Sequence, residues 1–225
     1  LVKDFPKCNW HQYFSIFPNN VPITNLLFWL DSPFRSIITV PEDLFFINAC
    51  IGQVLVLFSI YQSVRLLDLI FDKTFGNVLL FFYILSPTYL IQFTQIAYSD
   101  TYSLPFLIAS FRYIIQLLIT AKDISFDSLT KPTVSWYYII CSGAFMSLAL
   151  YLRPNSIIAL IAIMILALIL MAKNWRPLLL FLISLIFFSE AITFVSNKTL
   201  SQIYYVPIIS KDRKSTRLNY SYTDI

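Results

Sequence analysis

The sequence has few charged residues, and this shortage excludes a water-soluble fold. Charged residues make up 12 % of the 225 residues and hydrophobic residues 58 %, whereas soluble domains carry about 25 % charged and about 45–50 % apolar residues. So few charges cannot cover the surface of a soluble globule of this length. The composition therefore indicates that the membrane is the solvent.

Cysteine, histidine and glycine are also scarce. The three cysteines (Cys8, Cys50 and Cys141) show no metal or redox spacing, and we interpret the single histidine, His11, as a packing residue. No phosphate-binding loop or hydrolase motif occurs, and no basic stripe interleaved with aromatics indicates nucleic acid as a partner. The three glycines favour a fixed scaffold over a carrier whose helices rock or unwind.

Long apolar runs are abundant. A membrane-spanning helix needs about 20 mostly apolar residues. The runs predict an all-α, polytopic transmembrane helix bundle within residues 44–196, with about six spans: Leu44–Val64, Asn77–Ala97, Tyr102–Ala121, Trp136–Leu152, Ser156–Ala172 and Pro177–Ser196.

The segments on either side of the bundle differ from it in composition. Within residues 1–43, the stretch Tyr13–Pro41 is broken by prolines and rich in aromatics, so we expect short juxtamembrane helices in the outer interface. Residues 197–225 form an outer tail, of which we interpret 211–225 as disordered or foreign to the protein. Because residues 1–41 lack a signal-peptide pattern and follow no initiator Met, we expect an earlier span before Leu1.

Basic residues alternate between the connections. One set of connections holds pairs of basic residues: Arg65 with Lys73, Lys122 with Lys131, and Lys173 with Arg176. The other set holds Tyr98–Thr101, which has no basic residue, and the turn at Arg153. Cytoplasmic loops carry the excess of Lys and Arg, so we predict that the first set is cytoplasmic. Asp100 and Arg153 then share the outer face of the membrane.

Asp100 is the first candidate for a binding residue. It lies in the sequence Tyr98-Ser99-Asp100-Thr101 between two spans, where a carboxylate could hold a divalent cation or accept hydrogen bonds from sugar hydroxyls. The alternative is a helix N-cap, in which Ser99, Asp100 or Thr101 starts a helix with Pro105 in its first turn. Both interpretations can hold at once.

Three further ionisable residues lie at or inside the spans. Arg153 precedes Pro154 at the outer end of a span, where it could clamp a phosphate or serve as an anchor that reaches the lipid headgroups. Arg112 and Glu190 lie within spans, where each costs about 2.5–3.5 kcal/mol and should have a partner or a wet cavity. They lie in opposite halves of the bilayer, which argues against a direct pair.

Taken in chain order, these features resemble the GT-C superfamily of membrane glycosyltransferases. Residues 13–20, Tyr-Phe-Ser-Ile-Phe-Pro-Asn-Asn, look like the Tyr-x-x-x-Tyr-Pro-Asn-Asn stretch of its bacterial members, relatives of protein O-mannosyltransferases and of the lipid A aminoarabinose transferase. The turns at 98–101 and at Leu152-Arg153-Pro154 fall where such proteins place similar motifs. The resemblance runs from Tyr13 to Ser196.

The resemblance implies a lipid-linked sugar donor of the polyprenyl-phosphate type and transfer to an acceptor on the outer face. We expect the general base upstream of Leu1, because no Asp or Glu here matches the family's catalytic carboxylate, and this chain alone would then be inactive. A lipid or polysaccharide carrier, a repeat-unit polymerase and a structural membrane protein stay open as alternatives. The predicted substrate-binding residues are Asp100, Arg153, Asn19, Asn20, Tyr98 and Glu190, with a divalent cation considered at Asp100.

The predicted sidedness can be tested by labelling single introduced cysteines in intact cells. A membrane-impermeant maleimide should label a cysteine placed in the connection Tyr98–Thr101 and should not label one placed in Arg65–Lys73, because cytoplasmic connections are inaccessible from outside. The reverse pattern would place Asp100 and Arg153 in the cytoplasm and would remove the interpretation as an outer-face transferase.

Overall fold

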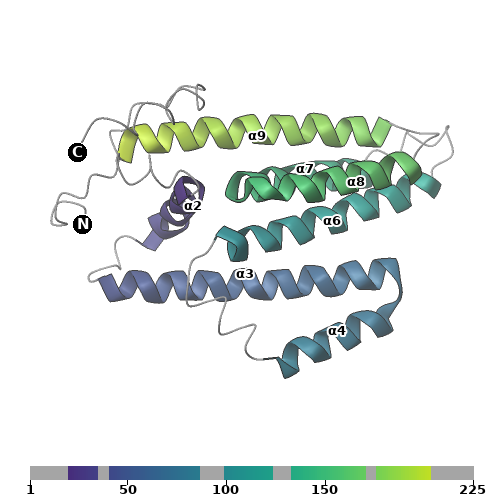
Figure 1. Ribbon diagram of the computed structural model, residues 1–225, viewed down its shortest axis with the longest axis horizontal. Coiled ribbons are helices and arrows are strands. Elements are labelled where there is room, and N and C mark those ends of the chain that lie inside the picture. The colour runs from purple at the N-terminus through teal and green to yellow at the C-terminus, as the bar shows by residue number, and fades with distance from the viewer. Residues whose placement is uncertain (1–19, 35–40, 87–98, 124–132, 171–175, 204–225) are drawn as a thin grey trace, which may run out of the picture.

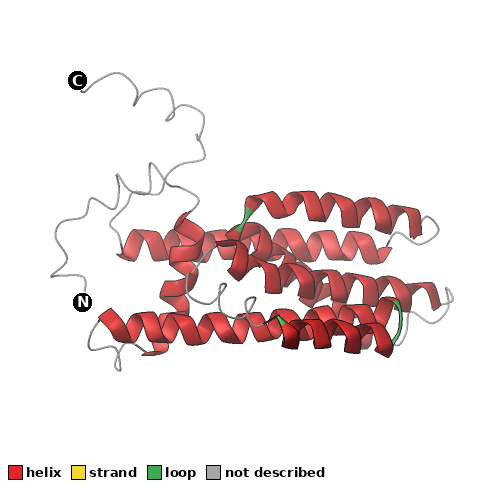
Figure 2. Cartoon of the chain, turned by 60° about the horizontal axis from the view of Figure 1, so that its bottom comes forward, coloured by secondary structure: helices red, strands yellow, loops and turns green. Residues whose placement is uncertain are grey.

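The computed structural model describes residues 20–34, 41–86, 99–123, 133–170 and 176–203, and in these ranges it contains helices and short loops but no strand (Figure 2). The prediction of an all-α fold is therefore confirmed. The described helices are seven α-helices and two short 3₁₀ turns: α2 (Val21–Asp31), η2 (Ser32–Phe34), α3 (Pro41–Ile70), α4 (Lys73–Leu85), α6 (Ser99–Asp123), α7 (Thr133–Leu152), η4 (Pro154–Ser156), α8 (Ile157–Leu170) and α9 (Arg176–Ile203).

The long helices lie side by side with their axes roughly aligned, as Figures 1 and 2 both show. Helix α7 packs between α6 and α9, and α6 in turn packs on α3. Helix α4 folds back along the second half of α3, and α2 lies across the ends of the bundle (Figure 1). One short helix, α2, thus occupies part of the proline-broken stretch 13–41.

The two ends of the bundle differ in charge. The chain leaves α3 for α4, α6 for α7 and α8 for α9 at one end, which we call the basic end because the three pairs of basic residues belong to these connections (Figure 1). The turn from α7 through η4 to α8 lies at the opposite end, next to α2, which we call the α2 end. Among the described residues, Arg65 and Lys73 therefore lie toward the basic end and Arg153 lies at the α2 end.

Three of the six predicted spans correspond to helices that are long enough to cross a membrane. The segments Glu42–Ile70, Ser99–Thr120 and Leu178–Thr199 are long and apolar enough to cross a membrane, whereas Lys73–Leu85, Trp136–Leu152 and Pro154–Ile169 are shorter apolar helices. Helix α4 has 13 residues, which is about 20 Å against a hydrocarbon core of about 30 Å. Most of the second half of its predicted span, residues 87–97, lies outside the described residues.

The outward faces of the helices are apolar. Among the exposed side chains are Phe45 at 76 %, Ile158 at 72 % and Phe194 at 71 % exposure. In water such a surface would aggregate, whereas lipid chains solvate it at no cost. The distribution of apolar side chains therefore fits a helix bundle in a bilayer.

Small polar residues hold α7 against its two neighbours. The Ser110 hydroxyl of α6 donates to the backbone carbonyl of Ser142 at 3.0 Å, and the Ser147 hydroxyl donates to the Leu185 carbonyl of α9 at 2.9 Å. Gly143 makes the second approach possible, because a Cβ there would lie 2.8 Å from the Cβ of Ser184 and 3.0 Å from the backbone nitrogen of Leu185. Small residues of this kind let membrane helices pack closely.

Adding bulk at Gly143 should therefore destabilise the bundle. We expect Gly143→Val to lower the free energy of unfolding by about 1–3 kcal/mol, because α7 and α9 must separate to admit the side chain. Thermal unfolding of the detergent-solubilised protein, followed by circular dichroism, measures the effect. The matched control is Ala162→Val on the exposed face of α8; an equal loss in both variants would contradict the close packing of α7 on α9.

Candidate functional site

Asp100 and Arg153, which the sequence singled out separately, form an ion pair at the α2 end. The guanidinium Nη1 of Arg153 contacts the carboxylate Oδ1 of Asp100. The two residues are 53 positions apart in the chain, and the packing of α7 on α6 brings them together. The sequence pattern singled out each residue and predicted that both lie on one face, but it did not predict that they bind one another.

The start of α6 positions Asp100. The residue lies in the first turn of the helix, where the exposed backbone N–H groups favour a carboxylate. The Ser103 hydroxyl donates to the Asp100 carbonyl at 3.1 Å and so ties the first turn together. Pro105 lies in the second turn and not in the first, as the helix begins at Ser99; having no N–H, it leaves the Thr101 carbonyl without its helical donor.

The end of α7 positions Arg153. Its backbone N–H still donates to the Ala149 carbonyl at 2.9 Å, and its own carbonyl accepts from the Ser156 N–H at 3.0 Å. Between these two bonds the backbone is extended, with φ −141° and ψ 101°. Pro154 then begins η4, because its fixed φ suits the first position of a helix. The side chain is thereby directed out of the helix and toward Asp100.

The ion pair is partly open to its surroundings. The side chain of Arg153 is 38 % exposed and that of Asp100 is 41 % exposed. A guanidinium has five N–H donors, so a single carboxylate contact leaves several of them available to an anion. The pair can therefore present a fixed cationic group at the surface while Asp100 limits its movement.

Helix α2 packs directly beside the pair. Ile23 and Leu26 of α2 form a buried cluster with Tyr102 of α6 and Leu152 of α7, and these last two residues are close neighbours of Asp100 and Arg153 in the chain. The Tyr102 hydroxyl donates to the Asn48 carbonyl of α3 at 3.3 Å. Three helices and α2 thus form one wall of the site.

A buried polar cluster fixes α2 in this position. The fully buried Asn25 donates from Nδ2 to the Tyr151 hydroxyl at 3.0 Å and to the Ser196 hydroxyl at 2.8 Å. The hydroxyl groups of Tyr151 and Ser196 lie 2.7 Å apart. The Trp29 indole stacks on Tyr151, with centroids 6.2 Å apart, and donates to the Thr199 hydroxyl at 3.0 Å. These residues join α2 to α7 and α9.

Sequence reasoning missed this polar cluster. Asn25 interrupts the apolar stretch Val21–Leu30. Ser196 is the last residue of the last predicted span, and Thr199 lies three residues past its end. A buried amide inside an apolar helix normally has hydrogen-bond partners, so Asn25 could have indicated that a polar cluster exists here. Its partners on α7 and α9 could not be named, because nothing local indicates which helices α2 crosses.

The other predicted site residues are more dispersed. Asn20 precedes α2 at the α2 end, and its carbonyl accepts from the Thr24 hydroxyl at 2.7 Å. Asn19 and Tyr98 lie outside the described residues. Glu190 is exposed on α9, one turn from the outward-facing Phe187 and Phe194, and the described contacts do not connect it with Asp100 or Arg153.

Two ionic expectations can be compared with the structure. Arg112 does not pair with Glu190; its Nη1 donates to the Gln62 Oε1 of α3 at 2.7 Å. The divalent cation considered at Asp100 stays a prediction; in the structure the Oδ1 of this carboxylate contacts Arg153. Among the described residues, no group of three or more Asp, Glu, His or Cys side chains gathers to hold a metal ion.

The helical fold, the apolar exterior and the polar groups gathered at the bundle ends define an integral membrane protein. A family model described as conserved hypothetical integral membrane protein matches residues 2–216, and the chain belongs to this family. No curated protein and no solved structure matches the chain. The family description establishes the membrane location and names no reaction.

If the hydrogen bonds of Asn25 anchor α2 to α7 and α9, removing them should destabilise the protein. Asn25→Ala removes two buried hydrogen bonds and should lower the free energy of unfolding by about 1–2 kcal/mol. Thr24→Ala is the matched control, because the one hydrogen bond of that hydroxyl among the described residues goes to a carbonyl of the preceding turn. Thermal unfolding in detergent measures both variants. An Asn25→Ala protein as stable as Thr24→Ala would mean that the cluster does not anchor α2.

Proposed function

We propose that the protein is a membrane glycosyltransferase similar to the GT-C superfamily. It moves a sugar from a polyprenyl-phosphate-type donor to an acceptor on the outer face, at a site built on Asp100 and Arg153. The six spans predicted from the sequence, with the α2 end on the outer side of a bacterial cytoplasmic membrane, belong to this proposal.

The single observation that supports it is the ion pair between Asp100 and Arg153. Two turns that resemble GT-C motifs, 53 positions apart in the sequence, contribute one residue each to the same contact. The contact lies at the end opposite the basic connections, beside α2, which follows the Pro-Asn-Asn stretch directly. Asp100, Arg153 and α2, the helix that follows this stretch in the chain, therefore lie at the same end of the bundle.

The roles of the two residues follow from their geometry. Arg153 binds the donor phosphate through the N–H groups that Asp100 leaves available, and it stabilises the negative charge that the phosphate gains as the sugar departs. Asp100 acts as a positioning residue that keeps the guanidinium directed toward the donor. The polyprenyl chain lies against the exposed apolar faces of the helices. No residue of this chain is assigned as the general base.

A carrier is supported less well than a transferase. A carrier of charged substrates is expected to have paired charges near the midplane and broken helices. Among the described residues, Arg112 is bound to a neutral amide and Glu190 faces outward. The binding roles predicted for Asn19, Asn20, Tyr98 and Glu190 remain part of the transferase proposal.

Substitution of Arg153 tests the proposal in membranes that contain the full-length protein. With a panel of radiolabelled polyprenyl-phosphate hexoses as probes, Arg153→Ala should lower transfer of label by about 100-fold, because a charge-stabilising donor is lost. Asp100→Asn should lower it less, since that side chain acts through Arg153. Transfer at the wild-type level in Arg153→Ala would overturn the proposal.

An exchanged pair separates a binding role from a structural one. The double variant Asp100→Arg with Arg153→Asp keeps an ion pair between α6 and the end of α7 but moves the guanidinium to the other helix. We expect it to unfold slightly below the wild-type temperature, because an arginine in the first turn of α6 and an aspartate at the end of α7 oppose the helix dipoles, and to stay deficient in transfer. Recovery of transfer in the exchanged variant would mean that the pair only supports the fold. For the single variant Arg153→Ala, the control is Lys73→Ala at the opposite end, which also removes one positive charge.

A further inference from the structure

Arg112 lies in the wall between α3 and α6 with neutral partners. Its Nη1 donates to the Gln62 Oε1 at 2.7 Å, and its guanidinium carbon lies 5.2 Å from the ring centroid of Tyr113 and 5.8 Å from that of Tyr61. An amide oxygen and two aromatic rings orient a guanidinium well. They do not cancel its charge, which is costly to hold within a bilayer.

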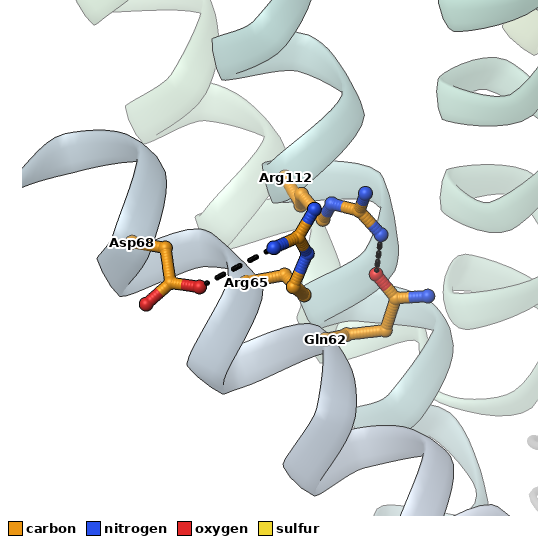
Figure 3. Close-up of polar contacts among 4 residues, drawn as sticks. All are labelled: Gln62, Arg65, Asp68 and Arg112. Carbon is orange, nitrogen blue, oxygen red and sulfur yellow. Dashed lines mark hydrogen bonds and ion pairs between the residues drawn. The ribbon is translucent and has the colours of Figure 1, made fainter. Parts of the chain in front are cut away.

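A second guanidinium lies one helical turn further along α3. Arg65 is three residues after Gln62 and four after Tyr61, so the three side chains share one face of the helix. Figure 3 shows the Arg65 side chain between Asp68 and Arg112. Its contact with the Asp68 carboxylate is 3.5 Å long, and 49 % of the Arg65 side chain is exposed. Two cationic groups therefore gather where the described contacts provide one carboxylate.

The aromatic side chains fix the level of this cluster in the bundle. The hydroxyl groups of Tyr113 and Tyr137 lie 3.2 Å apart, and their rings meet edge to face at 5.6 Å. Tyr137 belongs to the second turn of α7, at the basic end, and both it and Trp136 are about half exposed. Exposed Trp and Tyr side chains mark the headgroup level of a bilayer. Arg112 is therefore close to that level.

The exposed face of α3 changes in character at the same level. Leu57, Tyr61 and Arg65 follow one another at four-residue spacing, and Leu57 and Tyr61 are 58 % and 53 % exposed. From the middle of the bundle toward the basic end, the face is first aliphatic, then aromatic and finally cationic. This order matches an acyl chain, the glycerol region and a phosphate.

We propose that Arg65 and Arg112 bind the phosphate of an anionic membrane lipid where α3 packs on α6. The two planar guanidinium groups supply parallel N–H donors for the phosphate oxygens. The lipid contributes a negative charge beyond the single carboxylate found among the described contacts of the cluster, and its acyl chain lies along Leu57 and Tyr61. A free phosphate ion would match only the cationic end of this face. The site lies at the basic end and is separate from Asp100 and Arg153.

Native mass spectrometry of the detergent-solubilised full chain tests the proposal. Phosphatidylglycerol is the anionic probe and phosphatidylcholine, which carries the same phosphate without net charge, is the matched lipid. We expect the wild-type protein to bind phosphatidylglycerol about tenfold more tightly. Arg65→Gln and Arg112→Gln should each remove most of this preference, whereas Lys73→Gln, which removes an exposed charge at the same end, should keep it.

Three results would overturn the proposal. Equal binding of the two lipids would exclude selection for negative charge, and a loss in Lys73→Gln as large as in Arg65→Gln would mean that the whole basic end attracts lipid without a site. Displacement of phosphatidylglycerol by millimolar inorganic phosphate would make the ligand a free anion. Arg65 is exposed, so its variant decides the matter even where Arg112→Gln fails to elute as a folded species in size-exclusion chromatography.

Discussion

The close approach of α7 to its two neighbours is the contact on which the rest of the structure depends. Within a bilayer no water is available to satisfy polar groups, and apolar side chains gain little by leaving lipid for protein, so helices associate through packing and internal hydrogen bonds. Ser110 and Ser147 donate to carbonyls on the facing helices, and Gly143 removes the side chain that would keep α9 away. The position of α7 then determines where its last residues, and with them Arg153, are presented.

Each end of the bundle has its own arrangement of polar groups. At the α2 end, a buried amide network holds a short helix beside an ion pair that is partly exposed. At the basic end, arginine side chains from α3 and α6 lie at the level of exposed tyrosines. The long faces between the ends are mostly apolar. A bilayer requires such a separation, because charges are costly at its centre and are tolerated where water and headgroups begin.

The family shown by comparison is defined by its membrane location, and the chemistry has to be argued from the site. Two proposals follow from different groups of residues. One concerns a phosphate on a sugar donor at Asp100 and Arg153, and the other a phosphate on a structural lipid at Arg65 and Arg112. Both proposals depend on guanidinium groups held by neighbouring side chains. One can fail without the other, because the two sites lie near opposite ends of the bundle.

The sequence by itself determined the membrane class, the helical architecture and the alternation of basic connections, because lipid solubility and helix length depend on local composition. It also identified Asp100 and Arg153 as chemically unusual. Only the tertiary structure decided that these two bind one another, that Asn25 joins three helices and that Arg112 faces Gln62. Such contacts join positions far apart in the chain, and which helix faces which is set by packing between small and large side chains, which no local pattern records.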